Sequence, residues 1–180
     1  SIVINEDDIG NASVFRKTDL KPGDELAIIT GKGDLKLTTG PSDDEIFVAY
    51  VDERDFLYYA PSGTFDISTG AGDDQFGSGP FGSNKGAEFT VDLGPGRDRY
   101  SYFPTPDRDT IDGGTGSDYI ADATKAIGGA GSDYIGGSAV SFGGRGDDLL
   151  WLYSDSRVKG SPVEATGGSG NDVFSINPNS

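Results

Sequence analysis

The stretch at residues 113–135, GGTGSDYIADATKAIGGAGSDYI, contains one eight-residue phrase twice, G-G-x-G-S-D-Y-I, at a step of 15 residues. Glycine adopts backbone conformations with positive φ, so each phrase predicts a tight turn. The aspartate places a carboxylate beside that turn, and the apolar residue two positions later can enter a core from a following strand. The repeat therefore predicts a turn that recurs for a structural reason or because it binds something.

The same phrase occurs seven times along the chain when its positions are numbered one to eight. The copies are residues 39–46, 69–76, 93–100, 113–120, 128–135, 143–150 and 167–174. Position two is always glycine, position four is glycine except at Ser42, and position eight is always large and apolar. Position six is aspartate in every copy: Asp44, Asp74, Asp98, Asp118, Asp133, Asp148 and Asp172. A degenerate copy at residues 30–37 has Leu35 at the aspartate position.

Short β-type segments precede or follow most of these turns, and no helical periodicity interrupts them. The aspartates recur at steps of 30, 24, 20, 15, 15 and 24 residues. A repeated strand–turn–strand unit of this kind is typical of a β-solenoid. We therefore expect an all-β fold, a parallel β-roll or β-solenoid with glycine-rich turns and irregular loop inserts. One domain, 1–180, would contain the repeat region at 30–176 and an N-terminal cap at 1–29 that protects the open sheet edge.

The composition excludes several classes of function. The chain carries 14 basic and 30 acidic residues, a net charge of −16, which disfavours nucleic acid and anionic membranes and attracts cations. Cysteine and histidine are absent, which removes thiolate chemistry and the usual zinc ligands. No apolar run is long enough to span a membrane. The absence of methionine suggests a domain of a longer protein.

The seven copies resemble the calcium-binding nonapeptide repeat G-G-x-G-x-D-x-U-x of RTX (repeats-in-toxin) proteins. The resemblance covers residues 30–176 and implies a parallel β-roll that binds several Ca²⁺ ions between neighbouring turns. It further implies a secreted, extracellular and bacterial protein, released by type I secretion. The implied ligands are the seven aspartates named above with backbone oxygens of the glycine turns, chiefly Gly114, Gly116, Gly129, Gly131, Gly144, Gly146, Gly168 and Gly170.

The chain also departs from that family. A nine-residue step occurs only at residues 30–47, and the 15-residue steps predict one calcium-type turn per coil, on one side only. Ser42 replaces a glycine in the first copy. Arg97 and Arg99 flank Asp98, where a salt bridge would take the place of an ion.

Elementary chemistry favours calcium in such turns. Stacked strands lie about 4.8 Å apart, so a column of carboxylates at that spacing repels itself. The turns offer only oxygen ligands, which suit Ca²⁺, whereas Mg²⁺ demands tighter geometry and gives up its waters reluctantly. The composition is also poor in hydrophobic residues, 34%, for so high a net charge. We therefore expect a largely disordered metal-free chain that folds on binding calcium.

Four interpretations remain open at this point. The leading one is a non-catalytic calcium-binding module, with calcium ions and neighbouring domains of a larger protein as its partners. An adhesin or carbohydrate-binding module would use aromatic residues such as Tyr58, Tyr59, Tyr102 and Phe103 to contact a glycan. A calcium-assisted polysaccharide lyase would need a basic cluster, for which Arg97, Arg99 and Arg108 are the candidates. In the fourth, the glycine turns are structural and bind no ion.

Overall fold

The fold is described by a computed structural model at residues 2–4, 13–16, 25–29, 35–52, 57–59, 63–78, 87–101, 108–153 and 164–177. Every regular element in these ranges is a β-strand, which confirms the all-β prediction. A membrane-crossing helix is accordingly not found among these residues.

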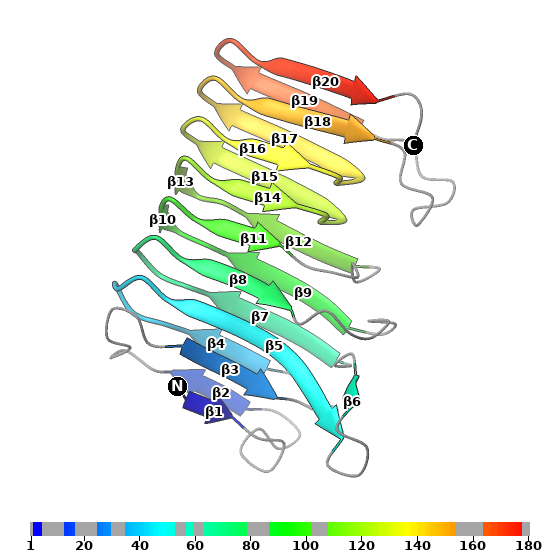
Figure 1. Ribbon diagram of the computed structural model, residues 1–180. Helices are drawn as coiled ribbons and strands as arrows, with labels where there is room; N and C mark the ends of the chain where they lie inside the picture. Colours follow the sequence, from blue (N-terminus) through cyan, green and yellow to red (C-terminus); the bar gives the residue numbers. More distant parts are fainter. Residues whose placement is uncertain are drawn as a thin grey trace.

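The strands form two sheets that face each other across a narrow core (Figure 1). We call them the post-turn sheet and the pre-turn sheet, after their position relative to the glycine turns. The post-turn sheet contains β1 (Ile2–Ile4), β3 (Glu25–Ile29), β5 (Glu45–Asp52), β8 (Gln75–Ser78), β11 (Arg99–Ser101), β14 (Tyr119–Ala121), β16 (Tyr134–Gly136), β18 (Leu149–Tyr153) and β20 (Val173–Asn177), with β6 (Leu57–Tyr59) paired to β5.

The pre-turn sheet runs alongside in the same order. It contains β2 (Ser13–Arg16), β4 (Leu35–Thr38), β7 (Gly63–Ser68), β9 (Ala87–Asp92), β12 (Arg108–Asp112), β15 (Lys125–Ala130), β17 (Val140–Arg145) and β19 (Glu164–Ser169), with the two-residue strands β10 (Pro95–Gly96) and β13 (Thr115–Gly116) in the turns. Each coil of the chain thus passes through one pre-turn strand, a turn and one post-turn strand.

Neighbouring coils pair in parallel throughout, and the antiparallel pair β5–β6 is the exception among the described strands. The pairing register aligns identical motif positions. Position eight, for example, runs in register from Ile46 through Phe76, Tyr100 and Ile120 to Ile135. The sequence alignment of the repeats is therefore the structural alignment of the coils, and the prediction of a parallel β-solenoid is confirmed at the level of the fold.

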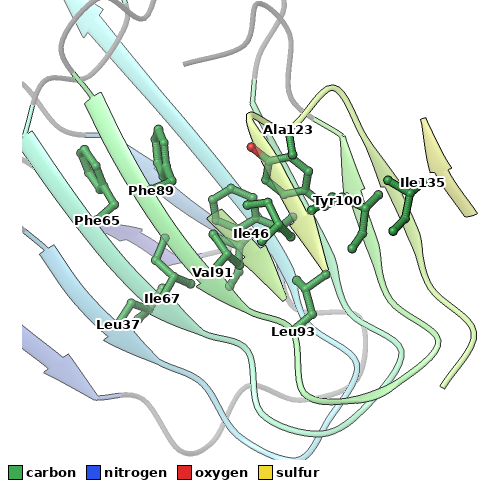
Figure 2. Packing of buried hydrophobic residues seen from close by; sticks show 14 residues of the cluster. Leu37, Ile46, Phe65, Ile67, Phe89, Val91, Leu93, Tyr100, Ala123 and Ile135 are labelled. Carbon is green, nitrogen blue, oxygen red and sulfur yellow. The ribbon is translucent and has the colours of Figure 1, made fainter. Parts of the chain in front are cut away.

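The core lies between the sheets and changes in character along the stack (Figure 2). In the upstream coils it is aromatic: Phe65 stacks on Phe89 at 4.7 Å between ring centroids, and Phe76 stacks on Tyr100 at 5.6 Å. In the downstream 15-residue coils the core is aliphatic, with Ile120, Ile135 and Leu150 buried at position eight and the smaller Ala126 and Ser141 buried in the pre-turn strands. The short coils are therefore compatible with a thinner core, because their interior residues are smaller.

Several predicted features lie wholly or mostly outside the described residues. They are most of the loop inserts expected near 61–63, 77–86, 103–109 and 153–162, and the side chains of Tyr58, Tyr59, Tyr102 and Phe103. Within the region 1–29, the described strands β1 and β2 form the terminal strands of the two sheets. Their role as a cap stays a prediction.

Candidate functional site

The glycine turns stack directly on one another along one edge of the solenoid. Gly131 has φ 138°, and a β-carbon added there would lie 1.4 Å from the carbonyl oxygen of Gly116 in the preceding coil. A β-carbon on Gly129 would likewise lie 2.1 Å from the carbonyl oxygen of Gly114. Only glycine fits at such contacts, so positions two and four are fixed by backbone stacking.

The aspartates of position six form a continuous buried column beside these turns. From Asp44 to Asp148, the backbone N–H of each aspartate donates to Oδ1 of the equivalent aspartate in the next coil. Asp118 N–H, for instance, donates to Asp133 Oδ1 at 2.9 Å, and Asp133 N–H donates to Asp148 Oδ1 at 2.9 Å. One carboxylate oxygen per coil is therefore used to hold the coils in register.

The second oxygen of these carboxylates is buried and has no hydrogen-bond donor. This is true of Oδ2 in Asp74, Asp98, Asp118, Asp133 and Asp148. Burial disfavours the charged form, so it raises the pKa of Asp74, Asp118 and Asp133 to about 6 and that of Asp98 to about 7, and it also raises the pKa of Asp148. Hydrogen bonds to the column partly oppose this shift, and neighbouring carboxylates in the column add to it. A buried acceptor without a partner costs free energy, so the column favours a cation or a proton.

In the downstream turns the unpartnered oxygen faces a space that a missing β-carbon leaves. A β-carbon added to Gly113 at position one would lie 2.7 Å from Asp118 Oδ2 and 2.6 Å from the carbonyl oxygen of Gly128 in the next coil. A carboxylate oxygen and a carbonyl oxygen therefore converge on one point. The same arrangement recurs at Gly128 and Gly143.

In the first two turns, position one carries a threonine instead. The hydroxyl of Thr39 donates to the carbonyl oxygen of Thr69, and the hydroxyl of Thr69 donates to the carbonyl oxygen of Leu93 at 2.7 Å. Thr69 also interacts with the Asp74 carboxylate and lowers its pKa, although burial outweighs this effect. In these two turns the hydroxyl proton of the threonine is used on the carbonyl oxygen of the next coil, and Asp74 Oδ2 still has no donor.

The predicted ligand aspartates are brought together as one column, from Asp44 to Asp172, by the hydrogen bonds between successive coils. The glycines predicted as carbonyl donors stand at positions two and four, and the carbonyl oxygen of Gly114 already accepts the N–H of Ala130 at 2.9 Å. The glycines that face the carboxylates stand at position one, which the sequence analysis did not single out. The signal was present, since position one is glycine in the last four copies and threonine or leucine in the first three.

The described side chains contain no cluster of three or more acidic groups poised around one metal position. Each candidate space therefore offers one carboxylate oxygen with backbone oxygens rather than a cage of carboxylates. Calcium accepts mixed carboxylate and carbonyl ligands, so the oxygen-only donor set fits this ion.

The expected salt bridge at Asp98 is wrong for the described part of the chain, where the ion pair found is Lys36 with Asp66. Asp98 Oδ1 instead accepts the N–H of Asp74 at 2.7 Å. The reason is the direction of the side chains: Asp98 is buried at the turn, whereas Arg97 and Arg99 are exposed.

Asp109 is a buried carboxylate outside the column, inside the core. The hydroxyl of Tyr100 donates to its Oδ2 at 2.7 Å, and the N–H of Thr124 donates to its Oδ1. Burial raises the pKa of Asp109 although these hydrogen bonds oppose the shift. Both oxygens have protein donors, so nothing at this carboxylate requires an ion.

Comparison with protein-family models, with curated proteins and with solved structures found no match to this chain.

Proposed function

We propose that this chain is a calcium-binding β-solenoid module, akin to the RTX proteins, in which bound Ca²⁺ completes the stack of turns. The observation that carries the proposal is the row of buried Oδ2 atoms without donors in Asp118, Asp133 and Asp148. Each faces a position-one glycine and a carbonyl oxygen of the next coil. A divalent cation is the partner that satisfies oxygens alone and offsets the repulsion along the column.

The residues that would hold the ions follow from this arrangement. They are Asp118 with the carbonyl of Gly128, Asp133 with the carbonyl of Gly143, and Asp148 with the carbonyl of Gly167. The ion supplies positive charge and several oxygen coordination positions. The chain's own contribution is to place a carboxylate from one coil beside a carbonyl from the next, so that binding joins neighbouring coils.

Binding would be weak, because each space contributes a single carboxylate oxygen. Affinities on the order of 10⁻⁴–10⁻³ M are typical of extracellular calcium modules. Such affinities suit a secreted protein that stays unfolded where calcium is scarce and folds where it is abundant. In this proposal the module is non-catalytic, and its role is calcium-driven folding next to other domains.

The experiment is a far-UV circular dichroism titration of metal-stripped protein with Ca²⁺ and, separately, Mg²⁺ at neutral pH. The proposal expects a change from coil to strand with calcium at millimolar concentration and little change with magnesium. A protein that is fully folded without metal and does not respond to calcium would overturn it.

A matched pair of variants ties this response to the column. Asp133→Asn keeps one carbonyl oxygen for the N–H of Asp118 and replaces Oδ2 by an N–H₂ donor that suits the facing carbonyl. We expect this variant to be more stable than wild type without calcium and to gain less from calcium. Asp92→Asn removes the same charge at an exposed position and should behave like wild type.

A further inference from the structure

A groove of about 940 Å³ runs along the outer surface where the turns meet the post-turn sheet, across four coils. It is lined by residues from position seven, Arg99, Tyr119, Tyr134 and Leu149, which are in register from β11 to β18. It is also lined by position-five residues, Arg97, Ser117, Ser132 and Asp147, and by the position-six aspartates Asp98, Asp118 and Asp133. The position-five side chains are exposed.

Three of these lining residues have a backbone amide without a protein acceptor within the described ranges. They are Ser117, Ser132 and Asp147 in three successive coils. An amide donor at the surface can take an acceptor from a ligand, and donors repeated at the coil spacing of about 4.8 Å form a row.

In other coils of the protein, the equivalent amides have an acceptor, and its identity indicates which chemical group fits this row of donors. At the equivalent position, Asp73 N–H donates to Asp43 Oδ1 at 2.9 Å, and Arg97 N–H donates to Asp73 Oδ1 at 2.9 Å. Asn171 N–H donates to Asp147 Oδ1 at 2.7 Å. In each case a carboxylate from position five of the preceding coil accepts the bond. Where that residue is Arg97, Ser117 or Ser132, the chain supplies no carboxylate.

Two guanidinium groups stand at the same end of the groove. Arg97 and Arg99 line it, and neither forms an ion pair with the described residues, although the chain has 30 acidic residues against 14 basic ones. The Arg99 guanidinium lies over the ring of Tyr119, 5.1 Å from its centroid, which holds it in place. Arginine is well suited to bind carboxylates through two parallel hydrogen bonds.

From these contacts we infer that the groove binds an acidic oligosaccharide, whose ring carboxylates occupy the row of amides and the arginine end. Hydroxyls of the sugar suit the remaining groups, because Ser117 and Ser132 can exchange hydrogen bonds with them and Asp147 can accept one. This mixture of donors and acceptors fits a sugar that bears both carboxylates and hydroxyls better than a chain of carboxylates alone.

Stacking of sugars on tyrosine faces does not contribute to this site. The rings of Tyr119 and Tyr134 stack on each other at 4.8 Å and 2°. The other face of Tyr119 carries Arg99, and Trp151 stands edge-on against Tyr134 at 6.5 Å. Tyr119 and Tyr134 therefore line the groove, Tyr119 holds Arg99, and charge and hydrogen bonding provide the recognition.

The test uses trigalacturonate as the probe, with its methyl ester as the uncharged counterpart, and calcium-loaded protein in low salt. Isothermal titration calorimetry measures affinity, and ¹⁵N–¹H correlation spectra report the amides of Ser117, Ser132 and Asp147. We expect these three amide signals to shift with the acid, at least tenfold weaker binding of the methyl ester, and weaker binding at high salt.

The most informative variant introduces aspartates at position five in two coils that lack them. Ser117→Asp with Ser132→Asp recreates the arrangement of Asp43 and Asp73, so it should fold normally, accept the amides of Ser132 and Asp147, and weaken binding at least tenfold. Thr115→Asp with Ser169→Asp adds the same charge at exposed positions of the turns outside the groove, and should weaken binding much less. Arg97→Gln with Arg99→Gln should also weaken binding, whereas Arg145→Gln, outside the groove, should not.

Three outcomes would overturn the inference: no shift of the three amides, equal loss of affinity in both aspartate pairs, or equal binding of an acidic peptide such as tetraglutamate. The proposal goes beyond calcium binding, because the donors of this row are separate from the oxygens of the aspartate column. Calcium binding that persists without saccharide binding would refute this inference alone.

Discussion

The first three turns and the last four share the column of aspartates but differ in the residue at position one. Both groups stack glycines, and the position-six aspartate is buried in every turn from Asp44 to Asp148. Upstream, position one is Thr39, Thr69 or Leu93, and the two threonines donate hydrogen bonds to the carbonyl of the next coil. Downstream, position one is glycine, and a carboxylate oxygen and a carbonyl oxygen face each other without a side-chain donor from that position.

This difference indicates where a bound ion contributes most. The upstream coils have an aromatic core, and the hydroxyls of Thr39 and Thr69 donate to carbonyl oxygens of their turns. In the downstream coils Ile120, Ile135 and Leu150 take the place of the aromatic rings, and Ala126 and Ser141 lie opposite them, so these coils bury less apolar surface and their turns have more to gain from a ligand. In our account, hydrophobic packing stabilises the upstream half and calcium stabilises the downstream half.

The largest expected effect comes from breaking the stack of downstream turns. In Gly131→Ala the new β-carbon would overlap the carbonyl oxygen of Gly116, and alanine at φ 138° is strained. We expect a loss of at least about 2 kcal/mol of unfolding free energy, measured by denaturant titration in calcium. Ser132→Ala, one residue away and exposed, is the control. Wild-type stability in the Gly131→Ala variant would refute the stacking geometry.

Next in size is the pH dependence of the metal-free protein. The folded-state pKa of about 6 for Asp74, Asp118 and Asp133, and about 7 for Asp98, lies above the ordinary value of 3.8. A raised carboxyl pKa means that the folded state binds protons more tightly, so its contribution to stability is present below pH 4 and is lost as the pH rises through 6 to 7.

We therefore expect metal-free protein to be more stable at pH 4 than at pH 8, which is the reverse of the usual behaviour of salt-bridged aspartates. Thermal unfolding across this range, in buffer stripped of metal by a chelating resin, measures the effect. Saturating calcium should flatten the profile above pH 6. Stability that rises with pH in the absence of metal would contradict the account.

A smaller effect follows from placing the threonine of the upstream turns at position one of a downstream turn. Gly128→Thr places a hydroxyl and a β-carbon in the space between Asp133 Oδ2 and the carbonyl of Gly143. We expect the variant to bind one calcium ion fewer by calorimetry, with its other sites retained. Unchanged stoichiometry would show that the space at position one does not determine binding.

The smallest effect concerns the buried carboxylate that already has donors. Tyr100→Phe removes the donor to Asp109 Oδ2 and should cost about 1–3 kcal/mol of stability by denaturant titration. Calcium stoichiometry should stay the same, because Asp109 lies outside the column. A changed number of bound calcium ions in this variant would contradict the claim that Asp109 takes no part in calcium binding.

The repeat made much of this fold predictable. The spacing of glycine, aspartate and the apolar residue determined which residues pair across coils, and the register from Ile46 to Ile135 follows it. The contacts of the buried carboxylates were harder to predict. The contact of Asp118 with Gly113, and the Tyr100–Asp109 pair, depend on how coils of different lengths stack, and motif spacing alone does not encode this.

The groove on the outer surface was also beyond the sequence. Ser117 and Ser132 look like ordinary turn residues, and only the hydrogen bonds of Asp43, Asp73 and Asp147 in other coils reveal the carboxylate missing from theirs. The sequence did mark Arg97 and Arg99 as unusual, but it assigned them to Asp98 rather than to the groove.

The most direct test of the central claim is the number of calcium ions bound by the folded protein, measured by calorimetry and native mass spectrometry on wild type and on the triple variant Asp118→Asn, Asp133→Asn, Asp148→Asn. The account predicts three ions in wild type, one for each space at Gly113, Gly128 and Gly143, and none of these three in the variant. Wild-type protein that binds no calcium, or a triple variant that binds as many ions as wild type, would contradict it.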